Sequence, residues 1–318
     1  MKPPAWPRVT INDCNGIPRQ AIAPLVISVS RATDIPAHFS TWFLEQWERG
    51  YVEWKNPFNG KPLLVSFEKV RVIVFWSKNP APLLPHLGRF RERGILTLFQ
   101  VTVNDYEHEG FEPGIPPLRE RIATVRSLSA VAGNDRVLWR FDPLLLTGAT
   151  GPRQLLDKIE RIGDQLYGAV SRLTVSFFSP YRTPVSRMRR SGIVPQELSE
   201  TVVEKIGTGL SQLKHQWKME IVTCAEKTDL RPYGIQPGSC IDPDLVFRLA
   251  GDDPLTADFF SAYSSPALFK DPEQLRRRLK DPGQRPRCNC MVSKDIGRYG
   301  TCTFGCVYCY AGQKSVRR

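Results

Sequence analysis

Runs of apolar and β-branched residues recur along the chain, and each is followed by a segment with a different hydrophobic pattern. Six runs are almost continuously apolar, as expected for strands that are covered on both faces of a parallel sheet. The runs span residues 25–31, 70–80, 96–104, 137–146, 172–180 and 219–227. We predict a β-strand in each of them.

Segments between the runs carry the pattern of helices. Apolar residues spaced three and four positions apart occur in residues 117–133, 152–168 and 194–218, which is typical of helices packed on one side. Another helix is predicted after Asp34, a residue type that caps helices, with Pro36 early in it and a glycine at its end. Strand and helix alternate about six times, which predicts right-handed β/α units and an α/β fold.

Polar side chains gather where the predicted strands end. They are Ser28, Ser30, Arg31, Ser77, Lys78, Asn79, Asn104, Arg140, Asp142, Ser176, Ser179, Thr223 and Glu226. In a β/α barrel the carboxyl ends of all strands meet on one face, whereas a doubly wound sheet gathers only those beside its switch point. We therefore expect a partial or full TIM-like barrel of about six units over residues 1–280. Taken singly, each residue is better explained as a helix cap or a loop anchor than as part of a site.

Arg140 and Asp142 leave the fourth predicted strand together, in the stretch WRFDP. An arginine there could hold a carboxylate or phosphate in a forked pair, and the alternative is a mutual ion pair that supports a loop. Glu226 is a weaker catalytic candidate, and Lys78 and Asn79 are weaker candidates for cofactor binding. None of these five residues lies in a motif that specifies a reaction.

Composition narrows the class of protein. With 41% hydrophobic and 24% charged residues, the chain has the make-up of a soluble globular protein. It contains no apolar run long enough for a signal peptide or a membrane span, so the cytoplasm is the expected location. The net charge of +12 makes nucleic acid a possible partner or substrate, although the basic runs are short.

Cysteines are concentrated near the C-terminus, in a segment over residues 281–318 that lacks hydrophobic periodicity. Thiols stay reduced in the cytosol, so such a group more often binds metal than forms disulfides. Cys302, Cys306 and Cys309 have C-x3-C-x2-C spacing, and Gly305 lets the loop bend tightly. Three soft ligands on one short loop suit an iron–sulfur cubane, with one iron left open to a substrate. We expect this loop to dock on the barrel mouth.

Four further cysteines are candidates for a second metal site: Cys224, Cys240, Cys288 and Cys290. Cys224 ends the sixth predicted strand and Cys240 follows it, so both are expected near the barrel mouth. Four thiols could hold a second iron–sulfur cluster or a tetrahedral zinc ion. The alternative is that Cys224 and Cys240 are ordinary buried thiols. Cys14 is assigned no role.

The C-x3-C-x2-C spacing, with Tyr308 directly before the last cysteine, resembles the cluster motif of radical S-adenosylmethionine enzymes. That resemblance implies a 4Fe-4S cluster on the three cysteines, with Tyr308 near the adenine of S-adenosyl-L-methionine. It also implies formation of a 5′-deoxyadenosyl radical, a β/α barrel and a reduced flavodoxin- or ferredoxin-type electron donor. In most members, however, the motif follows the first strand, whereas only nine residues follow Cys309 here.

The stretches SVSRATDIP, FWSKNP, WRFDP, TCAEK and DIGRYGTCTFGCVYCYA resemble the domain of unknown function 1848 family. That family has a C-terminal cysteine cluster like the one that radical enzymes, including those similar to spore photoproduct lyase, carry near the N-terminus. We therefore expect a radical S-adenosylmethionine-type enzyme that abstracts hydrogen from an unknown substrate. The alternative from another class is a zinc-stabilised nucleic-acid-binding protein without catalysis.

Overall fold

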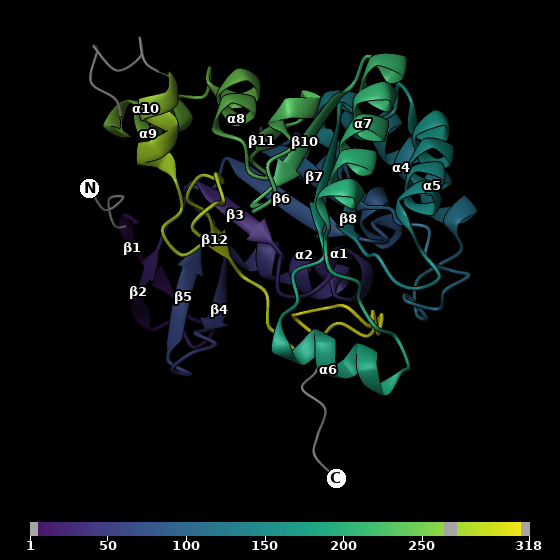
Figure 1. The fold of residues 1–318 in the computed structure, drawn as a ribbon. Helices are drawn as coiled ribbons and strands as arrows, with labels where there is room; N and C mark the ends of the chain where they lie inside the picture. The colour runs from purple at the N-terminus through teal and green to yellow at the C-terminus, as the bar shows by residue number, and fades with distance from the viewer. Residues whose placement is uncertain (1–5, 264–271, 313–318) are drawn as a thin grey trace.

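A computed structural model describes residues 6–263 and 272–312 of the chain (Figure 1). Residues 1–5, 264–271 and 313–318 lie outside the described part, and with them the last six residues of the predicted cluster segment. The described residues form a large parallel sheet, helices on both of its faces, and a second, smaller sheet.

The large sheet has eight strands in the order β11-β10-β9-β8-β7-β6-β3-β12, and every neighbouring pair is parallel. The strands are β3 (Val26–Val29), β6 (Val72–Ser77), β7 (Leu96–Thr102), β8 (Val137–Leu144), β9 (Arg172–Phe177), β10 (Glu220–Cys224), β11 (Gln236–Gly238) and β12 (Lys294–Asp295). The six predicted strands and the α/β class are confirmed. The two short edge strands, β11 and β12, carry too few apolar residues for the pattern to predict them.

Within the large sheet, the strands from β3 to β11 lie side by side in the same order as in the chain, without a reversal. Successive right-handed crossovers therefore place the connecting helices on the same face of the sheet. This is the winding of a β/α barrel rather than of a doubly wound sheet. Closure into a barrel is not seen in the described residues, where β11 and β12 form the two edges.

Helices occur throughout the chain. Their bounds are α1 (Ile35–His38), α2 (Ser40–Arg49), α3 (Gly88–Arg91), α4 (Leu118–Ala132), α5 (Pro152–Leu166), α6 (Arg182–Arg190), α7 (Glu200–Trp217), α8 (Pro243–Ala250), α9 (Pro254–Tyr263) and α10 (Pro272–Leu279). The predicted helices correspond to α1 and α2, α4, α5 and α7. Asp34 caps α1 as predicted, because its side chain accepts a hydrogen bond from Ala37 N at 3.0 Å.

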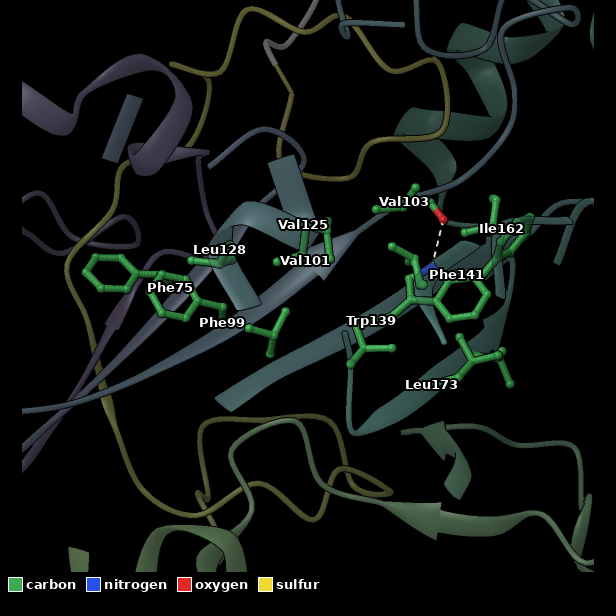
Figure 2. Close-up of a cluster of buried hydrophobic side chains, with 14 of the residues drawn as sticks. Phe75, Phe99, Val101, Val103, Val125, Leu128, Trp139, Phe141, Ile162 and Leu173 are labelled. Carbon is green, nitrogen blue, oxygen red and sulfur yellow. Dashed lines mark hydrogen bonds between the residues drawn. The ribbon is translucent and has the colours of Figure 1, made fainter. Parts of the chain in front are cut away.

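One face of the large sheet packs against α2, α4, α5 and α7 in a continuous apolar core. Trp139 of β8 is fully buried there, and its indole N–H donates to the Val103 carbonyl at 3.0 Å, as Figure 2 shows. Val125 and Ile162, from α4 and α5, lie in the same cluster (Figure 2). Because the apolar stripe of each helix meets this face, the helices cover it completely enough to bury the strands.

The opposite face of the large sheet is covered by the C-terminal third of the chain. We call it the inward face, because it corresponds to the face that points inward in a closed β/α barrel. Leu98 and Leu138 of this face pack with Val246 of α8, Phe260 of α9 and Leu279 of α10. The sequence indicated a polar tail without a core of its own from residue 281. In the structure, parts of this tail pack into the cores on both faces of the large sheet.

β12 attaches this tail to the sheet beside β3. The Asp295 carboxylate accepts hydrogen bonds from the hydroxyls of Ser28 and Ser30, both at 2.7 Å, and from Arg31 N at 2.8 Å. Gly297 follows closely, and a side chain there would overlap Ser30 Oγ. The polar end of β3 is therefore in part an anchor for the C-terminal segment.

The smaller sheet has the order β1-β2-β5-β4 and lies beside β12 in Figure 1. Its strands are β1 (Arg8–Asn12), β2 (Pro18–Ile22), β4 (Tyr51–Lys55) and β5 (Pro62–Ser66). The prediction for residues 1–280 did not include it. None of the helices in the described residues has both the length and the apolar character needed to cross a bilayer.

Candidate functional site

The loop that carries Cys302, Cys306 and Cys309 packs against the segments that follow strands β3 and β7. Thr301 Oγ1 donates to Thr33 Oγ1 at 2.9 Å, just after β3. Beyond β7, Gly114 N donates to the Phe304 carbonyl and Val307 N donates to the Phe111 carbonyl, each at 3.0 Å. The loop therefore lies at the carboxyl ends of the parallel strands, on the side where β/α enzymes place their sites.

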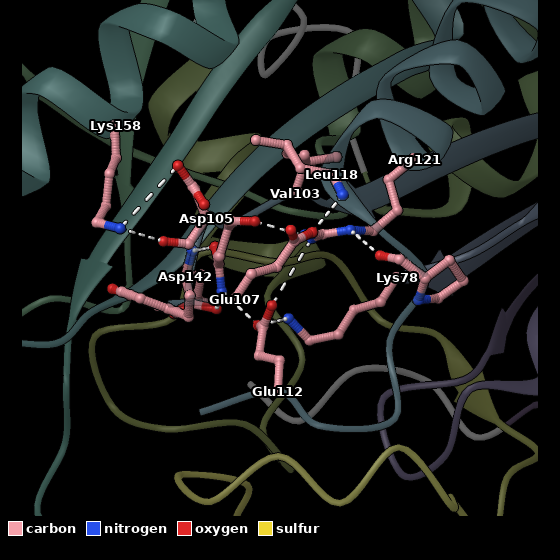
Figure 3. A network of polar contacts seen from close by, with 12 residues as sticks. Lys78, Val103, Asp105, Glu107, Glu112, Leu118, Arg121, Asp142 and Lys158 are labelled. Carbon is pink, nitrogen blue, oxygen red and sulfur yellow. Dashed lines mark hydrogen bonds and ion pairs between the residues drawn. The ribbon is translucent and has the colours of Figure 1, made fainter. Parts of the chain in front are cut away.

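A buried polar network holds Tyr308 at this edge of the sheet. Its hydroxyl donates to the Glu112 carboxylate and accepts from Lys78 Nζ and Asn104 Nδ2, both at 3.0 Å. Lys78 directly follows β6 and Asn104 lies just beyond β7. Figure 3 shows Glu112 beside Lys78 and Arg121 in this network. Three segments that are far apart in sequence thus meet at one phenol oxygen.

Ion pairs between oppositely charged side chains offset the cost of burying the charges in this network. Lys78 Nζ lies 2.7 Å from Glu112 Oε1, and Arg121 Nη1 lies 3.7 Å from Glu112 Oε2. Burial by itself raises the pKa of Glu112, but the charge and hydrogen bond of Lys78 outweigh it and the pKa falls below its usual value of 4.5. Burial likewise disfavours the Lys78 cation, and Glu112 raises the pKa of Lys78 above its usual value. Both groups are ionised at neutral pH.

The three thiols of the loop lie close enough for their charges to interact. Burial raises the pKa of Cys306 to about 12, opposed by the positive charge of Lys78. Burial also raises the pKa of Cys302, and hydrogen bonds from the backbone N–H groups of Phe304 and Asp34 oppose that rise. Thiols in such surroundings are not free thiolates at neutral pH, and a bound metal is what would deprotonate them.

Helix α6 holds the backbone of the same loop. Arg187 Nη1 donates to the carbonyls of Cys306 at 3.3 Å and Cys309 at 2.9 Å. Gly305 has a φ of +69°, a conformation that favours glycine, so the chain can turn tightly between Cys302 and Cys306. These contacts fix the loop through its main chain and do not involve the three thiols.

Three thiols on one short loop are the type of ligand that a 4Fe-4S cluster takes. In the described residues no three cysteine, histidine, aspartate or glutamate side chains are placed so that they could hold a metal ion, and this applies to both groups of cysteines. A cubane is bound at a different iron by each thiolate, so its ligands need not converge on one point. The N–H groups at Cys302 and the cation of Lys78 suit the negative charge of thiolate ligands.

Arg140 and Asp142 form an ion pair at the end of β8, which is the structural alternative that the sequence left open. Asp142 also accepts from the hydroxyl of Ser176. Despite burial, the Arg140 charge keeps the pKa of Asp142 below its ordinary value. Arg140 Nη1 lies 2.7 Å from Cys240 Sγ as well. Both side chains therefore have protein partners, and a catalytic role for either stays a prediction.

Glu226 and Asn79 stabilise loops. The Glu226 carboxylate accepts from Phe177 N at 2.8 Å and from Thr228 N at 3.0 Å. The Asn79 amide oxygen accepts from Ala81 N at 3.3 Å. Two cofactor-binding residues were predicted besides Tyr308, namely Lys78 and Asn79. Lys78 contacts the cysteine loop, through the hydroxyl of Tyr308.

Sequence reasoning missed Glu112 and Arg187, which contact the loop most directly. Glu112 lies in a connection rich in glycine and proline, without a hydrophobic period to mark it as buried. Arg187 belongs to the basic run RMRR, where its neighbours Arg189 and Arg190 are exposed. Neither residue type nor spacing distinguishes these two side chains from ordinary surface charges.

The four other cysteines come together on the inward face of the large sheet. Cys224 Sγ and Cys240 Sγ are 3.0 Å apart, and the Cys290 thiol interacts with those of Cys240 and Cys288. All four residues are buried. Cys14 is exposed.

Cavities in the described part of the chain include two that lie outside this cysteine loop. One, of about 480 Å³, lies between α2 and the smaller sheet and is lined by residues such as Trp47, Glu48 and Arg71. The other, of about 430 Å³, runs along α6 and is lined by Pro180, Arg182, Val185, Ser186, Arg189 and Arg190. The second is strongly basic and lies on the helix that holds the cysteine loop.

Fold and site together define an α/β protein whose C-terminal cysteine loop lies at the carboxyl ends of a parallel sheet. The family model for a domain of unknown function (DUF1848) matches residues 26–311, and the chain belongs to that family. The match covers both the sheet and the cysteine loop. The chain matches no curated protein in sequence.

Solved structures offer only distant likenesses. The deoxyribose phosphate aldolase of Aeropyrum pernix is 13% identical, with a TM-score of 0.30 over 74% of this chain and 72% of that chain. A proposed alpha-L-fucosidase of Bacteroides thetaiotaomicron is 10% identical, with a TM-score of 0.28 over 59% of this chain and 83% of that chain. At such TM-scores neither likeness bears on the fold or the activity of this chain.

Proposed function

We propose that this protein is a cytoplasmic radical S-adenosylmethionine-type enzyme that binds a 4Fe-4S cluster through Cys302, Cys306 and Cys309. The observation that supports this most strongly is the position of the loop, at the carboxyl ends of the parallel strands beside Lys78 and Asn104. This is the end of the sheet at which β/α enzymes hold substrates.

The bound cluster and S-adenosyl-L-methionine would supply a 5′-deoxyadenosyl radical that abstracts a hydrogen atom from the substrate. The chain's own residues hold the loop in place for this chemistry. Arg187 fixes two loop carbonyls, and Glu112 fixes the Tyr308 hydroxyl. Lys78 lies near both Tyr308 and Cys306, so its charge favours thiolate ligands over thiols and favours the carboxylate of a bound cofactor.

An anionic substrate agrees best with the surroundings of the loop. Arg182 and Arg189 are exposed along the basic cavity on α6, next to the loop that Arg187 holds. Together with the net charge of +12, this makes a phosphate-bearing substrate such as nucleic acid the first class to assay. The electron would come from a reduced flavodoxin- or ferredoxin-type donor.

The test is formation of 5′-deoxyadenosine from S-adenosyl-L-methionine by protein that has been reconstituted anaerobically and reduced with dithionite. We expect the product with the wild type and with Cys14→Ala, whose thiol is exposed and distant in sequence from the loop. Cys306→Ala should abolish it, because the loop then retains only two thiol ligands. Equal product from Cys306→Ala and wild type would contradict the proposal.

The second candidate is a zinc-stabilised nucleic-acid-binding protein without catalysis, which the basic cavity on α6 also supports. The two candidates differ in colour and metal content. A brown protein with broad thiolate-to-iron absorption supports the enzyme, and a colourless protein that contains zinc and no iron supports the binding protein.

A further inference from the structure

Four buried thiols outside the cysteine loop lie together between the large sheet and the C-terminal segment. Cys224 ends β10, Cys240 follows β11, and Cys288 and Cys290 precede β12. Their thiols interact in the order Cys224, Cys240, Cys290, Cys288. The fold thus brings together four cysteines from three separate segments. The proposed reaction uses none of these four thiols.

Hydrogen bonds join the segment that carries Cys240 to the segment that carries Cys288 and Cys290. Met291 N donates to the Ile241 carbonyl at 3.0 Å, and Ser239 Oγ donates to the Asn289 carbonyl at 2.9 Å. Ile241 N also points at Cys290 Sγ, at 3.4 Å. This backbone N–H is the kind of partner that thiolate ligands have in metal sites. These contacts place Cys240 and Cys290 on segments that lie side by side.

Cationic side chains adjoin the thiols. Arg140 Nη1 lies 2.7 Å from Cys240 Sγ. Arg31 stacks on Trp76, with its guanidinium 4.9 Å from the ring centre, close enough to Cys290 and Cys240 to feel their charges. In the described residues the buried Nη2 of Arg31 has no hydrogen-bond partner. Arg31 thus presents an unused N–H beside two of the four thiols, Cys240 and Cys290, where an anionic group would give it a partner.

We propose that Cys224, Cys240, Cys288 and Cys290 bind a single zinc ion as four thiolates. Neighbouring sulfurs around a zinc ion are about 3.8 Å apart, since each lies ~2.3 Å from the metal in a tetrahedron. The 3.0 Å between Cys224 Sγ and Cys240 Sγ is nearer to that spacing than to the wider one of a cubane. As described, no three of these ligand side chains are placed to hold one ion, so the proposal requires the thiols to rotate toward the ion when it binds.

A zinc ion with four thiolates has a net charge of −2. The cations of Arg31 and Arg140 lie beside it and favour this charge, although Arg140 is also paired with Asp142. The ion would join the end of β10 to the segment before β12, from which the cysteine loop continues. It would thereby fix the C-terminal segment against the sheet, as structural zinc sites do. The site is independent of the proposed radical chemistry, because the two sets of ligands share no residue.

The test uses the full chain with Cys302, Cys306 and Cys309 all replaced by Ser, purified anaerobically without chelators. We expect about one zinc ion per chain and no iron in this variant. Adding Cys240→Ser and Cys290→Ser should lower zinc at least tenfold, whereas adding Cys14→Ser should leave it unchanged. Zinc-free protein, iron in place of zinc, or unchanged zinc after the Cys240 and Cys290 substitutions would each overturn the proposal.

A second measurement keeps the test decisive if the variant lacking Cys240 and Cys290 does not fold. The triple variant grown with Co²⁺ should show the thiolate-to-cobalt absorption of a tetrahedral site. Its four thiols should resist alkylation until the metal is chelated, whereas exposed Cys14 reacts at once. Immediate alkylation of all thiols, or a disulfide between Cys224 and Cys240 in the native protein, would overturn the assignment.

Discussion

Glu112 joins two cations and a phenol in the interior, so its charge controls the polar contacts beneath the cysteine loop. Glu112→Gln removes the charge but keeps the size, leaving Lys78 and Arg121 without their shared anion. We expect a loss of about 3 kcal/mol in the free energy of unfolding at pH 7, measured by urea titration. An unchanged midpoint would show that the pair contributes nothing to stability.

We also expect the effect of Glu112→Gln on the free energy of unfolding to depend on pH. The folded pKa of Glu112 lies below its ordinary value of 4.5, so its stabilising contribution is complete above that value and is lost as the pH falls through the folded pKa. The stability difference between wild type and Glu112→Gln should therefore be constant from pH 7 to about pH 5 and shrink below ~4.5. A difference that grows on acidification would contradict this reading.

Tyr308 contributes a hydroxyl to this network, and Tyr310 offers a matched control. The Tyr308 hydroxyl has three buried polar partners, whereas Tyr310 is 56% exposed and donates only to the Arg31 carbonyl at 3.2 Å. Tyr308→Phe should lower the free energy of unfolding by about 1–2 kcal/mol, because it leaves buried partners unsatisfied. Tyr310→Phe should change it by less than ~0.5 kcal/mol. Equal effects would contradict the network.

At the scale of elements, the fit of the cysteine loop against the segment after β7 depends on Gly114. A Cβ added there would meet the Phe304 carbonyl oxygen at 2.8 Å, and main-chain atoms cannot rotate away. Gly114→Ala should therefore displace the loop and destabilise the protein by about 1–3 kcal/mol. Gly148→Ala is the control, since nothing lies within 4 Å of its added Cβ.

Hydrogen exchange measures this displacement directly. In Gly114→Ala the amides of residues 301–311 should exchange faster than in wild type, with the strands of the large sheet unaffected. Wild-type exchange in this loop would show that its position does not depend on the close approach of Gly114.

Asp295 anchors the edge strand β12 through two hydroxyls and one backbone N–H of the β3 segment. Asp295→Ala removes all three charge-assisted bonds, so we expect a loss of at least ~2 kcal/mol. Residues 290–297 should also lose protection from hydrogen exchange. Asp258→Ala, at an exposed position on α9, is the control and should match wild type. Full protection in Asp295→Ala would mean that β12 is held by other contacts.

The sequence predicted the strands and helices that have a strong hydrophobic period, because burial on one or both faces leaves that pattern. It did not predict β12, which has only two residues. This strand depends on hydrogen bonds between Asp295 and the β3 segment, which is far away in the sequence. The smaller sheet was missed for a related reason, since exposed residues make up much of β1 and β2. Long-range polar contacts leave no periodic signal.

At the scale of the whole molecule, the C-terminal segment covers the inward face of the large sheet and then carries its loop to the strand ends. The cysteine spacing and the polar strand ends could be identified from sequence, as could Lys78 as a residue of that face. Glu112 and Arg187 could not, because only the fold brings them to the loop. Arg140 and Asp142 were correctly placed together, but the sequence could not choose between an ion pair and a ligand site.

The most direct test of the central claim is the iron content of protein reconstituted anaerobically with iron and sulfide. The account predicts about four iron ions per chain in the wild type and in Cys14→Ser. It predicts none in the variant with Cys302, Cys306 and Cys309 replaced by Ser. Wild-type protein that retains no more iron than this triple variant would contradict it.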